Sequence, residues 1–206
     1  IAAAKKLAHR GPDNFGYAAE LCEDKTLVGH NVFLAHNRLS IIDPTSGHQP
    51  LSNAAKTLYL TVNGEIFNYK ELKSKYSNYE YQSASDCEVI LALYSHHTNE
   101  GRNIITQDQV IQMLEELNGQ FSFVLYDTKN ELALIARDPF GITSLFWGED
   151  GDHQLVIASE IKAMENVRDV YFFEPGHYMI HDVGNINQLA YEPYFPKCRY
   201  GRWAAN

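Results

Sequence analysis

The feature that most restricts the fold is a series of short apolar segments in the second half of the chain. They span residues 121–126, 132–136, 144–147 and 155–158, and a turn of a few residues separates each from the next. Strands joined by such short turns pair as antiparallel hairpins, because a parallel pair needs a crossover of a dozen or more residues. We therefore expect an antiparallel sheet in this part of the chain.

The rest of the chain contains helices and strands in separate groups. The other expected helices cover 1–9, 107–117 and 160–165, and the other expected strands cover 32–36, 57–62 and 177–181. Two further helices are expected between Gly64 and about residue 97, and the second begins at Ser85, because Glu88 follows Ser85 at the spacing of a capping box. Asn63-Gly64, directly after a strand, is a turn signal. Such grouping favours the α+β class over an alternating α/β fold.

Size and charge indicate one domain with few classes of partner. The 206 residues suffice for a core without disulfides or metals, and we expect a domain over 1–185 and a tail or linker over 186–206. Acidic residues outnumber basic ones by 26 to 17, which argues against nucleic acid and anionic membranes. The longest apolar run, 89–94, is too short to span a bilayer. Three scattered cysteines suit a reducing cytoplasm.

Four polar clusters stand out beside the expected strands and turns. They cover residues 9–13, 37–40, 63–65 and 85–88. Taken singly, each has an ordinary explanation: Asn63-Gly64 as a hairpin turn, Asp86 as a carboxylate at a helix N-terminus, and Arg38 as half of a surface ion pair. Nucleophile-elbow, phosphate-loop and Cys-x-x-Cys motifs are absent, and the histidines lack ligand spacing, so no metal site is expected.

Taken together, the clusters and the segments around them resemble class II glutamine amidotransferase domains, and among these the asparagine synthetase branch. The motifs that carry the resemblance are Arg10-Gly11-Pro12-Asp13, Arg38-Leu39-Ser40-Ile41, Gln49-Pro50-Leu51, Asn63-Gly64-Glu65, Ser85-Asp86-Cys87-Glu88, Leu117-Asn118-Gly119, Ala136-Arg137-Asp138 and Ala158-Ser159-Glu160. The resemblance covers roughly residues 5–181. It implies a four-layer αββα sandwich of two antiparallel sheets, of the N-terminal-nucleophile hydrolase type.

The resemblance also implies hydrolysis of glutamine to glutamate and ammonia. Glutamine is a zwitterion, so its site needs a cation for the α-carboxylate and an anion for the α-ammonium. Arg38 is expected to bind the carboxylate and Asp86 the ammonium. The Asn63 side chain and the Gly64 backbone N–H are expected to stabilise the oxyanion formed on the amide. Glu65 is expected to line the same pocket.

Two further residues are singled out by comparison with the family pattern. Arg10 is expected to support the pocket from behind the substrate-binding residues. Ser144 stands where the family usually has proline, and it is expected to alter a turn and not the chemistry.

The family nucleophile is an N-terminal cysteine whose own amino group acts as base. This sequence begins at Ile1, so we expect that the first strand of the domain and its cysteine are missing and that the chain is inactive alone. Cys87 is not expected to replace it, because the neighbouring Asp86 opposes thiolate formation. The alternative left open is a non-catalytic module that binds a glutamine-like ligand. An amidotransferase with another acceptor is a third reading.

The resemblance assigns the remaining chemistry to a part that these residues do not contain. No cofactor is expected in this domain. ATP and Mg²⁺ would act in an absent synthetase domain in cis, which would convert aspartate to asparagine. Glutamine is the expected small-molecule substrate, and a homodimer is left open.

Overall fold

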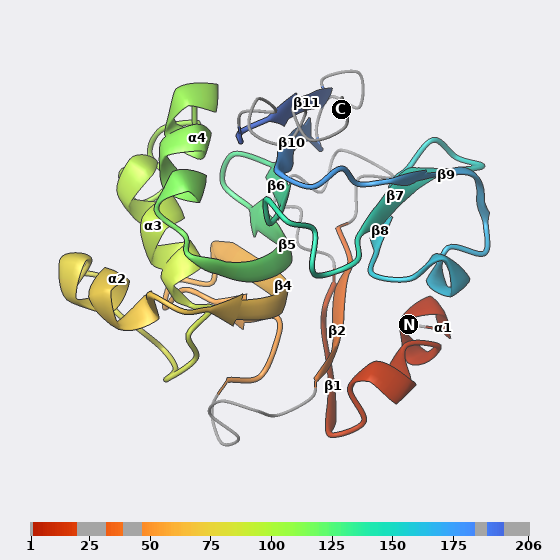
Figure 1. The fold of residues 1–206 in the computed structure, drawn as a ribbon, viewed down its shortest axis with the longest axis horizontal. Helices are drawn as coiled ribbons and strands as arrows, with labels where there is room; N and C mark the ends of the chain where they lie inside the picture. Colours follow the sequence, from red (N-terminus) through yellow and green to blue (C-terminus); the bar gives the residue numbers. More distant parts are fainter. Residues whose placement is uncertain (1, 20–31, 39–46, 184–188, 196–206) are drawn as a thin grey trace, which may run out of the picture.

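The computed structural model describes residues 2–19, 32–38, 47–183 and 189–195 (Figure 1). Its helices are α1 (Ala2–Lys5), α2 (Tyr69–Lys75), α3 (Val89–His97) and α4 (Gln107–Glu115), with the 3-10 turns η1 (Ala8–Arg10) and η2 (Ile161–Ala163). Its strands are β1 (Asn14–Ala18), β2 (Leu34–Arg38), β3 (Leu51–Ser52), β4 (Leu58–Ile66), β5 (Gly119–Asp127), β6 (Leu132–Arg137), β7 (Phe146–Asp150), β8 (Leu155–Ala158), β9 (Val167–Phe172), β10 (His177–Asp182) and β11 (Leu189–Pro193). In the described part of the chain, no helix is long and apolar enough to cross a membrane.

A six-stranded antiparallel sheet organises the molecule, in the order β11-β10-β6-β5-β4-β3. Helices α2, α3 and α4 cover one face (Figure 1). The buried surface of α3 extends over its residues 89–95, as is typical of a helix enclosed by a core. In α4 the apolar residues Val110, Met113 and Leu114 recur at helical spacing and are buried.

The opposite face of the large sheet packs against two smaller antiparallel sheets, β1-β2 and β8-β7-β9. Residues from all three sheets share one apolar cluster, including Leu34 of β2, Ile135 of β6 and Ile157 of β8. The short elements α1 and η2 contact each other beside these smaller sheets. Facing antiparallel sheets with helices outside confirm the expected α+β sandwich. The hairpin expected between segments 132–136 and 144–147 does not form, because β6 belongs to the large sheet and β7 to the sheet β8-β7-β9 that packs against it.

The longest strand pairing corrects one local prediction. Asn63 and Gly64 do not form a turn, because β4 continues to Ile66 in unbroken register with β5. Gly64 has φ of 154°, and a Cβ atom there would lie 2.0 Å from the carbonyl oxygen of Gln120. Only glycine fits so close to the neighbouring backbone, so the Asn-Gly pair serves the sheet and not a hairpin.

Two further expectations are corrected at element ends. Ser85 does not form a capping box with Glu88, because α3 begins at Val89 and the buried Glu88 carboxylate instead accepts hydrogen bonds from the N–H groups of Gln82 and Ser83 at 2.6 and 2.7 Å. The tail expected over 186–206 is not irregular throughout, because β11 adds an edge strand to the large sheet. Residues 184–188 and 196–206 lie outside the described residues.

Candidate active site

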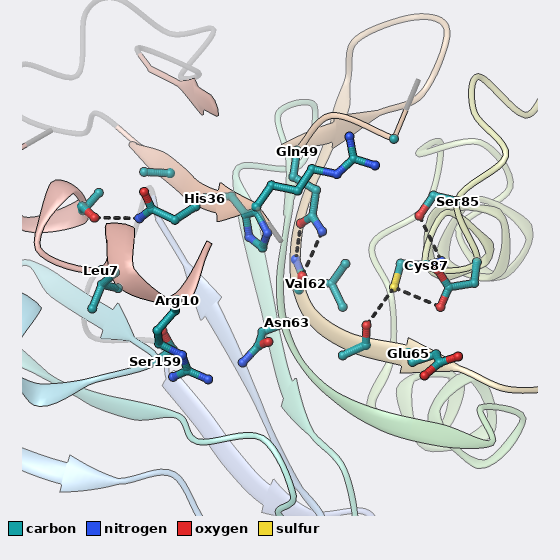
Figure 2. Close-up of a pocket in the computed structure, with 17 residues that line it drawn as sticks. Leu7, Arg10, His36, Gln49, Val62, Asn63, Glu65, Ser85, Cys87 and Ser159 are labelled. Atoms are coloured by element: carbon teal, nitrogen blue, oxygen red, sulfur yellow. Dashed lines mark hydrogen bonds between the residues drawn. The ribbon is translucent and has the colours of Figure 1, made fainter. Parts of the chain in front are cut away.

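A cavity of about 340 Å³ opens between β2, β4, the N-terminal segment and the loop before α3. The six site residues predicted from the sequence, Arg10, Arg38, Asn63, Gly64, Glu65 and Asp86, all line it. They come from segments far apart in the chain, which the β1–β2 hairpin and the edge of the large sheet bring together (Figure 2). Their shared position is observed, and the role of each remains a prediction.

Arg38 is the last residue of β2, and its side chain is buried at 6% exposure. The hairpin that carries it is held in place by close backbone contacts. A Cβ on Gly11 would lie 2.2 Å from the Asn37 carbonyl oxygen, and the Asp13 N–H donates to the Arg38 carbonyl oxygen at 3.1 Å. The Asn37 side chain donates to the Ala4 carbonyl oxygen at 2.6 Å. The Arg-Gly-Pro-Asp motif therefore supports Arg38 structurally.

His36 lies two residues before Arg38 and also lines the cavity. Burial, and secondarily the Arg38 charge, lower its pKa to about 4. Its imidazole is therefore neutral at neutral pH and adds no positive charge beside Arg38.

Asn63 and Gly64 are at the sheet edge that faces the cavity. Within the described part of the chain, the Asn63 carboxamide makes no hydrogen bond, so its N–H groups are available to a ligand. The Asn63 side chain extends toward the side of the cavity where Arg10 and Ser159 lie (Figure 2). The exposed Glu65 follows on the same strand.

Asp86 is buried at 5% exposure and is fixed by β4. The Ile66 N–H donates to Asp86 Oδ2 at 2.8 Å, and Cys87 Sγ lies 3.5 Å from the same oxygen and 3.7 Å from the Gly64 carbonyl oxygen. Burial, followed by the Asp86 and Glu65 charges, raises the pKa of the Cys87 thiol well above its usual range. Cys87 is therefore a protonated thiol, whose one S–H lies near two acceptors, and a poor nucleophile.

Arg10 forms part of the wall opposite Glu65 and Cys87 (Figure 2). Arg10 Nη1 donates to Ser144 Oγ at 3.2 Å and lies 3.4 Å from Glu160 Oε1, and the Ser144 hydroxyl in turn donates to the Ser159 carbonyl oxygen at 2.7 Å. Ser144, expected to affect a turn, thus also contacts a residue of the cavity wall.

The cavity presents both signs of charge to a ligand. Arg10 and Arg38 are cationic, whereas Glu65 and Asp86 are anionic. Such an arrangement suits a zwitterionic amino acid, with uncommitted amide donors left for its side chain. Sequence reasoning assigned no role in the cavity to three other lining residues, His36, Gln49 and Ser85. The Gln49-Pro50 motif was the available signal for one of them.

Comparison with known proteins shows which family the chain belongs to. A family model described as a glutamine amidotransferase domain matches residues 1–172. The chain belongs to the glutamine amidotransferase domain family. A maize relative, "Asparagine synthetase [glutamine-hydrolyzing]", is 40% identical over 197 residues, which are 95% of this chain and 30% of the relative. Asparagine synthetase B of Escherichia coli K12 is 40% identical over 195 residues, 93% of this chain and 31% of the relative.

Solved structures share the fold of this amidotransferase domain. Glutamine phosphoribosylpyrophosphate amidotransferase from B. subtilis has a TM-score of 0.69 at 22% identity, over 94% of this chain and 45% of that chain. An allosteric regulatory enzyme of purine biosynthesis has a TM-score of 0.62 at 26% identity, over 78% of this chain and 34% of that chain. The asparagine synthetases from maize and Escherichia coli are longer than this chain, which spans about a third of their length.

Proposed function

We propose that this domain hydrolyses glutamine to glutamate and ammonia within a glutamine-dependent asparagine synthetase. The observation that carries the proposal is the pairing of opposite charges around one cavity that also contains the Asn63-Gly64 edge. The names of the relatives, which are about 40% identical, support the same substrate.

The proposed binding mode uses one group for each part of glutamine. The Arg38 guanidinium pairs with the α-carboxylate, and the second Asp86 oxygen accepts from the α-ammonium while Ile66 holds the first. The side-chain amide then lies toward Asn63 and Gly64. The α-amino group of the N-terminal cysteine would take the thiol proton, and the thiolate would attack the amide carbon, so that the carbonyl oxygen becomes an oxyanion held by these donors. The C–N bond then breaks, and ammonia leaves with the proton that the α-amino group returns. Water then hydrolyses the thioester to glutamate.

We place the nucleophilic cysteine outside these 206 residues. A second cavity, of about 370 Å³, supports this assignment: it lies between β2 and β8, over β4 and β5. Each of these two outer strands has one partner among the described strands, β1 and β7 respectively. An extended segment in this space would pair with both edges and reach Asn63, which lines both cavities.

The acceptor chemistry is proposed for the rest of the protein. ATP and Mg²⁺ would be bound by a synthetase domain in cis, where ammonia would convert activated aspartate to asparagine. The support is that relatives with this name are about three times as long as the matched region.

Glutamate formation by the full-length protein tests the proposal. We expect release of glutamate and ammonia from glutamine, lost in Asp86→Asn and retained in Asp152→Asn, a matched change at an exposed residue. Glutamine binding without any glutamate release would instead identify a non-catalytic binding module.

A further inference from the structure

Strand β3 is short, and its pairing with β4 does not extend to Asn63 and Gly64. It pairs with β4 at two positions, Leu51 with Leu60 and Ser52 with Tyr59. The same antiparallel register, continued toward the N-terminus, places Gln49 opposite Val62. Pro50 lies between and has no N–H to donate to a sheet ladder.

The Gln49 side chain makes the hydrogen bonds that the backbone of β3 would make if β3 continued to this position. Its Oε1 accepts from the Val62 N–H at 2.7 Å, and its Nε2 donates to the Val62 carbonyl oxygen at 2.9 Å (Figure 2). These are the two hydrogen bonds that a directly opposed antiparallel pair exchanges. A carboxamide thus substitutes for a peptide group at one more position of the ladder.

This contact holds the backbone next to the predicted oxyanion donors. Residues two apart on a strand direct their N–H and C=O groups to the same edge, so Gly64 faces the edge that Gln49 holds at Val62. The hydrogen bond from Cys87 Sγ to the Gly64 carbonyl oxygen at 3.7 Å lies on this side. Asn63 lies between two residues whose backbone is held by side chains, Val62 by Gln49 and Gly64 by Cys87.

The Gln49 backbone is in turn packed against the hairpin that carries Arg38. A Cβ on Gly16 would lie 1.9 Å from the Gln49 carbonyl oxygen, and Gly16 pairs with His36 in the hairpin. Gln49 therefore contacts the carboxylate-binding hairpin with its backbone and the oxyanion-stabilising strand with its side chain.

We propose that Gln49 is a positioning residue that sets the place of the Asn63 and Gly64 donors relative to Arg38. The inference rests on the proposed glutamine hydrolysis. Both the Gln49 oxygen and the Gln49 nitrogen bind Val62, so the proposal assigns the effect of Gln49 to the position of β4. Its contribution is to the transition state, where the oxyanion exists, and not to ground-state binding.

The test uses the full-length protein with Gln49→Met, Gln49→Glu and the exposed control Gln154→Glu. Rates are expressed per active site, counted by stoichiometric labelling with an electrophilic glutamine analogue. For Gln49→Met we expect kcat for glutamine hydrolysis to fall by about tenfold or more, with KM changed by less than about threefold. Hydrogen exchange at the Val62 amide should become faster, and the control should match the wild type.

Gln49→Glu separates positioning from loss of folding. A protonated carboxyl can donate to the Val62 carbonyl oxygen, whereas a carboxylate cannot, so the ratio of its kcat to that of the wild type should rise as the pH falls. Taking the ratio removes titrations that both proteins share, such as those of His36, Glu65 and Asp86. A kcat of Gln49→Met within about twofold of the wild type, a rise in KM alone, or unchanged Val62 exchange would overturn the inference. Absence of glutamate release by the wild type would instead reject the proposed function.

Discussion

Arg38 is the residue whose loss we expect to weaken glutamine binding most. Its buried guanidinium lies at the end of β2, facing the cavity. Arg38→Ala would leave the substrate carboxylate without its cation in a desolvated site, a loss of about 2–5 kcal/mol. We expect the Kd for glutamine to rise by roughly 30-fold or more, measured by titration calorimetry on a form that lacks the nucleophile.

A matched change elsewhere controls for the loss of charge. Arg102 is exposed, and its ion pair with Glu100 spans 3.5 Å at the surface. Arg102→Ala should leave the Kd for glutamine unchanged. An unaltered affinity in Arg38→Ala would remove Arg38 from the site.

His36 makes the stability of the domain depend on pH. Its folded-state pKa of about 4 lies below the unfolded value of 6.5, so the folded state favours the neutral ring. The contribution of His36 to the free energy of unfolding is therefore fully present above pH 6.5. As the pH falls from 6.5 toward 4, the free energy of unfolding decreases by roughly 2–3 kcal/mol. Burial also lowers the pKa of His97 and His181, which adds a dependence of the same sign.

Urea denaturation at several pH values measures this effect. His36→Asn should flatten the fall in unfolding free energy between pH 6.5 and 4, whereas His153→Asn, at an exposed position, should retain the wild-type slope. Equal slopes in the wild type and His36→Asn would show that burial of His36 does not couple folding to protonation.

At the scale of elements, β4 connects the core to the site. Its buried residues Leu58, Leu60 and Val62 pack toward the helices, and its pairing with β5 extends through Gly64 to Ile66. The first and last residues of β4, Leu58 and Ile66, are both buried in the core, and residues 62–65 between them line the cavity. The position of Asn63 therefore depends on how tightly β4 lies against β5.

Gly64→Ala should disturb this strand directly. The added Cβ would lie 2.0 Å from the Gln120 carbonyl oxygen, so one backbone must move. We expect a loss of about 1–3 kcal/mol of unfolding free energy and a clear fall in kcat for glutamine hydrolysis. Gly151→Ala is the control, because nothing lies within 4 Å of its added Cβ. Equal stability of the two variants would mean that β4 and β5 separate without cost at Gly64.

At the scale of the whole molecule, we expect activity to require a further segment in the cavity between β2 and β8. A protein of only these 206 residues should form no measurable glutamate, because the buried Cys87 thiol is held protonated and cannot start the attack. Adding an upstream segment that begins with cysteine should restore ammonia release. Replacing that cysteine by alanine should abolish it again.

Cys87→Ala provides the decisive comparison in the restored protein. It should leave glutamate formation nearly intact, since Ile66 still holds Asp86 at 2.8 Å. Glutamate release by the 206-residue chain that disappears in Cys87→Ala would identify Cys87 as the nucleophile and reject the N-terminal mechanism.

The sequence by itself determined the features that depend on neighbouring residues or on motif order. Short turns predicted the β5–β6 and β7–β8 hairpins, and helical spacing of apolar residues predicted α4, because each of these patterns lies within one stretch of neighbouring residues. The ordered polar motifs predicted the family and the six residues that meet at the cavity. Their common position follows from the resemblance and not from local propensity.

The tertiary structure alone decided what depends on pairing between distant segments. The strands β1, β3, β9 and β11 escaped prediction, although four of the six residues of β9 are β-branched or aromatic, and what defines each of them is its pairing with another strand. The pairing of β4 with β5 turned Asn63-Gly64 from a turn signal into part of a strand. Gln49 acquired its role because its carboxamide lies opposite Val62, 13 residues away, where a strand would otherwise have been. Backbone hydrogen bonds at a sheet edge must be satisfied by whichever group the fold brings there, and local sequence does not specify that group.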